Sequence, residues 1–350
     1  MRIGLIPENP IERLVARLNV APRPLIDTQM AFTLARVVMA GAELGVFKAL
    51  ADGPATAAQI AERCGTDPDA TEKLLFALAA TDYLEFRGDR YELTRFSRKW
   101  LLPDSPTDLT DKLRFQLTEW QWMERSEEYV RTGQPLELHD MPAGEMWDSY
   151  QRGMRAMAGG FAPELVRRMP VPGGAVDLLD IGGSHGHYSS ELCRKHSGLQ
   201  AVVLDLPEAV EKAAPLLAAE GMGDRVTHRA GDALRDDLGE EDWDVVMIAQ
   251  LVHHFSDQQN RDLASRAARA LRPGGVYAIL DAFRSTRPGE AGQLPALLEF
   301  YFALTSQSGT WTPEEMADWQ RAAGLEPKRP IRFRSTPGAG IQAAVKPEAR

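Results

Sequence analysis

The stretch that decides the fold is Val176-Asp177-Leu178-Leu179-Asp180-Ile181-Gly182-Gly183-Ser184-His185-Gly186, an apolar run that leads into an acidic residue and a glycine-rich segment. The apolar run predicts a buried strand, and the glycines predict a tight turn into a helix, because glycine adopts positive φ at little cost. Free N–H groups at the start of such a helix face negative or polar groups of a ligand. The stretch therefore predicts a ligand-binding corner between a strand and a helix.

The glycine spacing leaves two kinds of site open. A dinucleotide fingerprint requires G-x-G-x-x-G, which the glycines at 182, 183 and 186 do not match. One interpretation is the turn that passes under the amino-acid end of S-adenosylmethionine. The other is a hydrolase nucleophile elbow, G-x-S-x-G, with Ser184 as the nucleophile. An elbow follows several strands, whereas the residues before 176 mostly predict helices, so the cofactor interpretation is favoured.

Carboxylates follow the next two predicted strands. The apolar segment 199–206 carries Asp205 at its end, and the strand predicted at 225–229 leads into Gly231-Asp232. An acid at the tip of the second strand accepts hydrogen bonds from ribose hydroxyls in nucleotide-binding folds. Asp232 is placed to accept a hydrogen bond from the adenine amino group. Acids at consecutive strand tips, in this order, indicate a nucleoside site.

With these motifs the chain resembles the S-adenosylmethionine-dependent O-methyltransferases of the caffeic acid, hydroxyindole and bacterial antibiotic-tailoring type. The resemblance covers nearly the whole length and rests on Asp180–Gly186, Asp205-Leu206-Pro207, Gly231-Asp232, Leu251-Val252-His253-His254-Phe255-Ser256-Asp257 and Leu271-Arg272-Pro273-Gly274-Gly275. It implies an α/β fold: a Rossmann-like class I methyltransferase sheet with an N-terminal, mostly helical, winged-helix dimerisation domain. It also implies that S-adenosylmethionine binds at Gly182, Gly183, Asp205, Leu206, Asp232 and Ala233 and is released as S-adenosylhomocysteine.

The candidate catalytic residues lie after the fourth predicted strand and at the end of the fifth. His253 and His254 come after the strand predicted at 243–249, and ligands of open α/β sheets bind beyond the carboxyl ends of the strands. A hydroxyl acceptor must lose its proton, and a neutral histidine is a competent base near pH 7. The resemblance assigns the base to His253 and an orienting acid to Asp281, for which a loop or N-cap role is the alternative. A second acid implied near Thr310 has no counterpart there.

The length of 350 residues favours more than one domain. We expect a winged-helix-like dimerisation domain at 1–105, a helical linker and pocket lid at 106–171, and the Rossmann-like domain at 172–350. The first domain is predicted from an apolar helical face within 26–50, two short helices, and a hairpin at 83–93. The apolar face predicts the interface of a homodimer.

Charge and composition narrow the classes of partner. A winged helix also suits a DNA-binding regulator, but the net charge of −10 disfavours contact with phosphates. Cys64 and Cys193 are the only cysteines and there is no His-Glu-x-x-His motif, so no metal is expected and a reducing cytoplasm is favoured. No apolar run reaches the roughly 18 residues of a membrane span, and the N-terminus lacks a secretory signal.

Together these patterns predict an S-adenosylmethionine-dependent O-methyltransferase that methylates a hydroxyl of a small aromatic or polyketide-like metabolite, as in antibiotic biosynthesis and other secondary metabolism. Aromatic and methionine side chains in the linker and in the helix predicted at 294–306 suit a pocket for a flat acceptor, although such residues more often fill a plain core. The alternative is an enzyme that keeps the fold and cofactor but catalyses hydroxylation, decarboxylation or a pericyclic step.

Overall fold

The computed structural model describes residues 4–136, 145–287, 292–306 and 308–348. It divides into two compact units, Arg2–Thr118 and Glu119–Arg350. The division falls inside helix α8 (Thr110–Met123), so the segment 106–171 is shared between the units. Residues 1–3 and 137–144 of the expected domains lie outside the described part of the chain.

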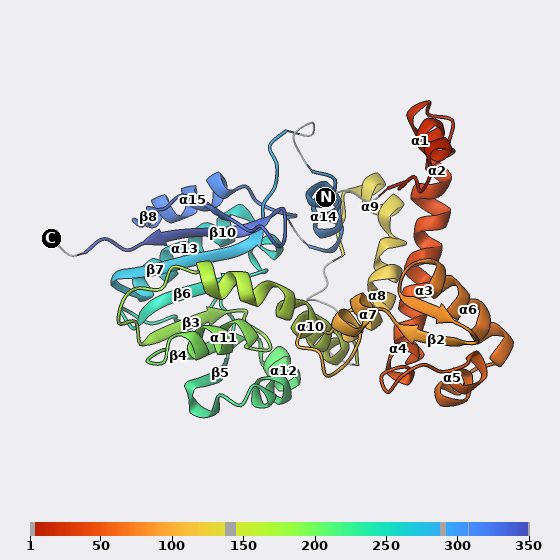
Figure 1. Ribbon diagram of the computed structural model, residues 1–350. Helices are drawn as coiled ribbons and strands as arrows, with labels where there is room; N and C mark the ends of the chain where they lie inside the picture. Colours follow the sequence, from red (N-terminus) through yellow and green to blue (C-terminus); the bar gives the residue numbers. More distant parts are fainter. Residues whose placement is uncertain (1–3, 137–144, 288–291, 307, 349–350) are drawn as a thin grey trace. The chain divides into compact units, whose positions relative to one another are not determined.

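The first unit is mostly helical and contains a two-stranded hairpin (Figure 1). Its elements before α8 are α1 (Pro10–Arg17), α2 (Arg23–Leu25), η1 (Ile26–Met30), α3 (Ala31–Glu43), α4 (Val46–Ala49), α5 (Ala57–Cys64), α6 (Pro68–Ala80), β1 (Leu84–Arg87), β2 (Arg90–Leu93) and α7 (Arg95–Trp100). Thr56 and Gln59 form a capping box at the start of α5. Strands β1 and β2 pair antiparallel from Leu84↔Leu93 to Arg87↔Arg90. The two helices and the hairpin lie where the sequence predicted them.

The apolar segment 26–50 is not one helix. It begins as the π-helical turn η1, continues as α3 and breaks at Gly45, whose φ of 77° is the left-handed conformation that favours glycine. Val38 and Gly41 lie in the unit's own core, in contrast to the expected partner-facing stripe. Further toward the N-terminus Met30 (52% exposed), Phe32 (49%) and Leu34 (41%) remain apolar and solvent-facing. The candidate interface is therefore the first half of the segment.

The second unit is built around a mixed eight-stranded sheet in the order β5-β4-β3-β6-β7-β10-β8, with β9 paired to β10. Its strands are β3 (Asp177–Ile181), β4 (Gln200–Asp205), β5 (Val226–Ala230), β6 (Trp243–Ala249), β7 (Leu271–Ala282), β8 (Glu326–Pro327), β9 (Ile331–Arg332) and β10 (Ala339–Val345). Strands β3 to β7 pair in parallel, and β10 is antiparallel to β7. The chain leaves β3 in one direction for β4 and returns to its other side with β6. Such a reversal opens a crevice at the carboxyl ends of the strands.

Helices cover both faces of the sheet (Figure 1). The helices of this unit after α8 are α9 (Ser126–Thr132), α10 (Glu145–Arg168), α11 (His187–Lys195), α12 (Pro207–Ala219), η3 (Gly223–Arg225), η4 (Val252–His254), α13 (Asp257–Ala270), α14 (Gln293–Thr305) and α15 (Pro313–Ala322). Alternate residues of a strand point to opposite faces, so Leu178 packs with α10 and α11 whereas Leu179 packs with α13 and α15. Both faces are buried, which explains the continuous apolar runs in the sequence.

Strand β7 is longer than expected. Asp281 was predicted to end this strand, and β7 runs from Leu271 to Ala282, because Ala282 and Asp281 pair with Ala339 and Gly340 of β10. Asp281 is therefore held at a fixed register inside the sheet, not in a loop. Among the described helices, none combines the length and the apolar character needed to cross a bilayer.

A buried carboxylate joins α10 to the segment between β9 and β10. Glu164 is 3% exposed, and it accepts hydrogen bonds from the N–H groups of Arg334 (2.9 Å) and Ser335 (2.8 Å) and from Arg168 (2.9 Å). Burial alone would raise the pKa of Glu164, but the bonds from Ser335, Arg334 and Arg168 outweigh it and lower this pKa to about 2. The ionised carboxylate thus anchors α10 beside the sheet.

Replacing Glu164 with glutamine should lower the free energy of unfolding by about 1.5–3 kcal/mol at pH 7, because charged hydrogen-bond partners lose their acceptor. The folded-state pKa lies below the ordinary value of 4.5, so the contribution is complete above pH 4.5 and is lost as the pH falls toward 2. Chemical denaturation of wild type and Glu164→Gln across this range measures the difference. Glu326→Gln, an exposed exchange of the same kind, is the control; equal stability of Glu164→Gln and wild type at pH 7 would contradict the anchor.

Candidate active site

The corner between β3 and α11 has the backbone that its glycines require. Gly182 has φ of 66°, and a Cβ added there would lie 2.4 Å from Cδ2 of Leu251. A Cβ at Gly183 would lie 2.4 Å from the carboxylate of Asp180. Neither position can carry a side chain without displacement of its neighbour. Gly182 also donates its N–H to the carbonyl of Leu204 at 2.7 Å, so the corner is fixed against β4.

Ser184 holds the tip of this corner through three partners. It adopts a φ of 50°, donates its N–H to Oδ2 of Asp205 at 2.8 Å, and bonds through its hydroxyl to the side chain of Gln151 on α10. Nε2 of His228 lies 2.7 Å from the Ser184 carbonyl oxygen. A hydrolase would place a histidine at the hydroxyl, so the geometry gives the nucleophile-elbow interpretation no support.

Asp205 ends β4 and turns its carboxylate toward the corner. Its two oxygens accept the N–H groups of Leu206 and Ser184, each at 2.8 Å. Burial raises the pKa of Asp205 to about 6, although the bonds from Leu206 and Ser184 partly offset this effect. The carboxylate is thus positioned by the backbone, and each oxygen retains acceptor capacity for a ligand hydroxyl.

A cavity of about 400 Å³ lies at this edge of the sheet. The sequence-predicted residues Gly182, Asp205, Leu206, Asp232 and Ala233 line it, whereas Gly183 does not. Trp147, Tyr150 and Gln151 of α10 line it too, together with Gln250, Leu251, His254, Phe255, Gln259, Thr305 and Ser306. Sequence reasoning noted Trp147 as a possible pocket residue but did not single out Tyr150 or Gln151, because only the packing of α10 brings them here.

The cavity fits the adenosyl cofactor expected from the sequence. Gly182 leaves room for a ligand to approach the backbone, since a side chain at this position would collide with Leu251. Acceptors for ribose hydroxyls and for an adenine amino group are present in Asp205 and Asp232 at neighbouring strand ends. Asp232 itself accepts the N–H of Leu234 at 2.9 Å, which orients its carboxylate.

His253 and Asp281 form a buried pair beside this cavity. Nδ1 of His253 lies 2.9 and 3.0 Å from the two carboxylate oxygens of Asp281, and the side chains are 2% and 1% exposed. The N–H of Ala282 donates to Asp281 at 2.7 Å. Parallel pairing of Ala249 with Leu280 brings the ends of β6 and β7 together and so makes the pair possible. A hydrogen bond donated by Nδ1 leaves Nε2 as the acceptor of the imidazole.

The turn that carries the two histidines is fixed from both sides. The carbonyl oxygen of Val252 accepts two hydrogen bonds, one from Nδ2 of Asn260 and one from Nε1 of Trp311, both at 3.0 Å. The centroid of the His253 ring lies 4.0 Å from the ring centroid of Phe302 and 4.2 Å from that of His254. His254 lines the cavity, whereas His253 lies behind it against Asp281. The two neighbours therefore occupy different environments.

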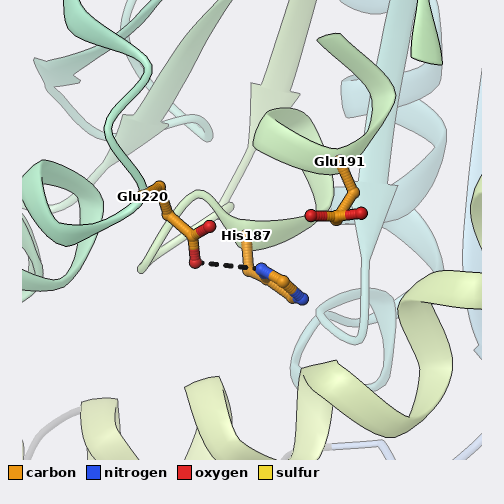
Figure 2. Close-up of side chains that lie close together, drawn as sticks. All are labelled: His187, Glu191 and Glu220. Carbon is orange, nitrogen blue, oxygen red and sulfur yellow. Dashed lines mark hydrogen bonds and ion pairs between the residues drawn. The ribbon is translucent and has the colours of Figure 1, made fainter. Parts of the chain in front are cut away.

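A second histidine–carboxylate group lies on the helices behind the corner. His187, Glu191 and Glu220 place ligand atoms within 4.8 Å of one another (Figure 2). Arg155 and Arg194 already bind the Glu220 carboxylate, at 2.7 and 3.0 Å, and its Oε1 lies 2.9 Å from Nδ1 of His187. Burial would raise the pKa of Glu220, but these partners lower it to about 2. Two guanidinium groups disfavour a bound cation, so the cluster is an ion-pair network that joins α10, α11 and the end of α12.

Comparison with known proteins identifies the class that this fold and site define. Residues 127–326 match the O-methyltransferase domain, and residues 26–103 match the O-methyltransferase dimerisation domain. The catalytic-domain match covers more than half of the chain. The chain therefore belongs to the S-adenosylmethionine-dependent O-methyltransferases, and its dimerisation domain supports a homodimer.

Individual relatives agree with this assignment. A 3-hydroxy-5-methyl-1-naphthoate 3-O-methyltransferase from Streptomyces sahachiroi is 30% identical over 93% of this chain and 95% of that protein. The N,N-dimethyltransferase OxyT of Streptomyces rimosus is 27% identical over 93% and 96%. The crystal structure of human N-acetylserotonin methyltransferase in complex with S-adenosylmethionine superimposes with a TM-score of 0.82 and 21% identity, over 97% and 99% of the two chains. That structure confirms the predicted class I fold.

Replacing Asp205 with alanine should weaken binding of S-adenosylhomocysteine by about 1.5–3 kcal/mol, roughly tenfold to more than a hundredfold in Kd, since charged hydrogen bonds to the ribose are lost. The wild-type affinity should decline below pH 6, because the pKa of Asp205 is about 6 and the protonated group is a poorer acceptor. Asp205→Asn should remove this pH dependence. Calorimetry checks both effects, with the exposed Asp224→Asn as control; an unchanged Kd for Asp205→Ala would remove Asp205 from the site.

Proposed function

We propose that this enzyme methylates a hydroxyl of a small aromatic or polyketide-like metabolite, with His253 as the general base and Asp281 as the residue that orients it. The observation that carries the proposal is the buried pair of His253 and Asp281 at the carboxyl edge of the sheet, next to the cavity. The 30% identical relative is named for methyl transfer to a hydroxyl of a naphthoate, which supports an aromatic acceptor.

The proposed mechanism follows from the hydrogen bonding of the pair. S-adenosylmethionine supplies an electrophilic methyl group when bound. Because Nδ1 of His253 faces Asp281, Nε2 is left to accept the proton that the acceptor hydroxyl would lose on methylation. Asp281 keeps the imidazole in the correct tautomer and stabilises the imidazolium that forms. The N–H of Ala282 keeps the carboxylate aligned during this step.

The cavity lining supports a flat, largely apolar acceptor. Trp147, Tyr150 and Phe255 contribute aromatic surface, and Phe302 packs on His253. Pockets of this kind bury an aromatic ligand between ring faces and orient it with a few polar groups. In the same arrangement the residues that line the cavity and hold the cofactor are Gly182, Asp205, Leu206, Asp232 and Ala233, with the ribose at Asp205 and the adenine near Asp232. Gly183, which the resemblance also assigns to the cofactor, lies outside this lining.

An amine acceptor is the second candidate. The relative from Streptomyces rimosus, 27% identical to this chain, is named an N,N-dimethyltransferase. A neutral amine attacks the methyl group before it loses its proton, so it depends less on a base. Assays with paired phenol and aniline acceptors of one ring system, read by mass spectrometry together with S-adenosylhomocysteine release, separate the two acceptors. Conversion of the acceptor without S-adenosylhomocysteine would instead indicate a different tailoring step on the same fold.

We expect this enzyme in the cytoplasm, as a homodimer and without a nucleic-acid partner. Cys64 and Cys193 are both free thiols, which suits the cytoplasm. The net charge of −10 disfavours nucleic acid as a partner. The exposed apolar residues Met30, Phe32 and Leu34 form the proposed contact surface of the homodimer.

Replacing His253 with alanine should lower the single-turnover rate of methyl transfer by about 10²–10⁴-fold, the usual contribution of a general base, and leave cofactor affinity nearly unchanged. The defect should shrink as the pH rises and the acceptor ionises by itself. Asp281→Asn should give an intermediate loss, because the base remains but its orientation and the charge that stabilises the imidazolium do not.

His254→Ala is the matched control, because His254 neighbours His253 in the same turn but lines the cavity, whereas His253 is bonded to Asp281. We expect its loss to be much smaller than that of His253→Ala. If His254→Ala is inactive and His253→Ala stays active, the general base is His254 and not His253. Full activity of both variants would rule out base catalysis by this turn.

A further inference from the structure

Ser184 carries a side chain in a backbone conformation that glycine adopts more easily. Its φ of 50° lies in the left-handed region, which residues other than glycine rarely adopt. Its hydroxyl donates a hydrogen bond to Oε1 of Gln151 on α10. The N–H of the same residue donates to Asp205 at 2.8 Å. One residue of the corner thus connects the expected acceptor of the ribose with a side chain of the covering helix.

Gln151 places a buried amide at the wall of the cavity. It is 1% exposed, and both Gln151 and Ser184 line the cavity of about 400 Å³. Because Oε1 of the amide is bound by Ser184, its Nε2 is directed elsewhere. The two N–H bonds of this Nε2 form no hydrogen bond with the residues that the structure describes. A buried donor without a protein partner at a cavity wall indicates an acceptor on a ligand.

The charges at the cavity wall indicate which ligand group needs such a donor. Asp205 and Asp232 contribute negative charge, and no lysine or arginine is present among the described residues that line the cavity. S-adenosylmethionine carries a carboxylate at its amino-acid end, and a buried carboxylate must be hydrogen-bonded. In this cavity the carboxylate therefore depends on donors other than an ammonium or guanidinium group of the protein, and an amide is one of them.

We propose that Gln151 binds the carboxylate of S-adenosylmethionine through Nε2, and that Ser184 is the positioning residue that holds the amide in place. The proposal rests on the proposed placement of the ribose at Asp205. The amino-acid end of the cofactor continues from the ribose through the sulfur. Ser184 binds both Asp205 and Gln151, so the amide lies at the part of the corner that this end of the cofactor approaches.

Gln151→Met tests this contact, because methionine keeps the length of the side chain and removes the amide. The two probes are S-adenosylhomocysteine and its decarboxylated form, S-adenosyl-3-thiopropylamine, which keeps the adenosyl group, the sulfur and the amine. In the full-length protein, calorimetry should show that Gln151→Met raises the Kd of S-adenosylhomocysteine by about tenfold to a hundredfold, as for other hydrogen bonds to charged groups. The Kd of the decarboxylated ligand should not change.

Two further variants test the direction of the hydrogen bond and the role of Ser184. Gln151→Glu should weaken S-adenosylhomocysteine more than Gln151→Met does, since its carboxylate repels that of the ligand. Ser184→Gly removes the hydroxyl but keeps the N–H that binds Asp205, and glycine suits the φ of this position. It should raise the Kd of S-adenosylhomocysteine by about twofold to tenfold and leave that of the decarboxylated ligand unchanged.

Gln258→Met, an exposed exchange on α13, is the matched control and should leave both affinities unchanged. Equal weakening of both ligands by Gln151→Met would overturn the proposal, because the amide would then contact another part of the cofactor or only support α10. Tighter binding of S-adenosylhomocysteine to Gln151→Glu would also overturn it, since the amide oxygen would then face the ammonium group.

Asp205→Ala separates a failure of this proposal from a failure of the proposed cofactor placement. The variant should weaken both ligands, because both carry the ribose. Unchanged binding of both ligands to Asp205→Ala would remove the ribose from Asp205 and with it the basis of the proposal. Weakening of both ligands by Asp205→Ala, with no effect of Gln151→Met on either, would keep the ribose at Asp205 and overturn only the role of Gln151.

Discussion

The parallel pairing of β3 with both of its neighbours is the constraint on which the site depends. Ile181 at the end of β3 pairs with Leu204 of β4 on one side and with Ile248 of β6 on the other. The glycine corner, Asp205 and the histidine turn therefore leave the sheet at the same level. Segments that are far apart in the chain meet around one cavity because three strands end together.

Close packing at this edge explains why side chains are excluded from the corner. Leu251 and Asp180 occupy the space that side chains at 182 and 183 would need. Ser184 completes the corner by joining β4 through Asp205 and α10 through Gln151. The same segment thus forms the ligand cradle and attaches a covering helix to it.

Much of this arrangement could be predicted from the sequence, because the motifs that carry it are local. Apolar strands, the glycine corner, Asp205 and the pair of histidines each follow from a few consecutive residues. The contribution of Gln151 could not be predicted, since it depends on how α10 packs against a corner distant in sequence. Asp281 was predicted at the end of its strand, but its pairing with Gly340 of β10 joins segments far apart in the sequence.

We expect the reactive end of the cofactor to lie between the glycine corner and the histidine turn. A crystal structure of the enzyme with S-adenosylhomocysteine tests this claim most directly. The account predicts ribose hydroxyls on Asp205, the adenine beside Asp232, and the sulfur facing the part of the cavity lined by residues 250–255. A ribose bound away from Asp205, or a sulfur that faces away from His253, would contradict it.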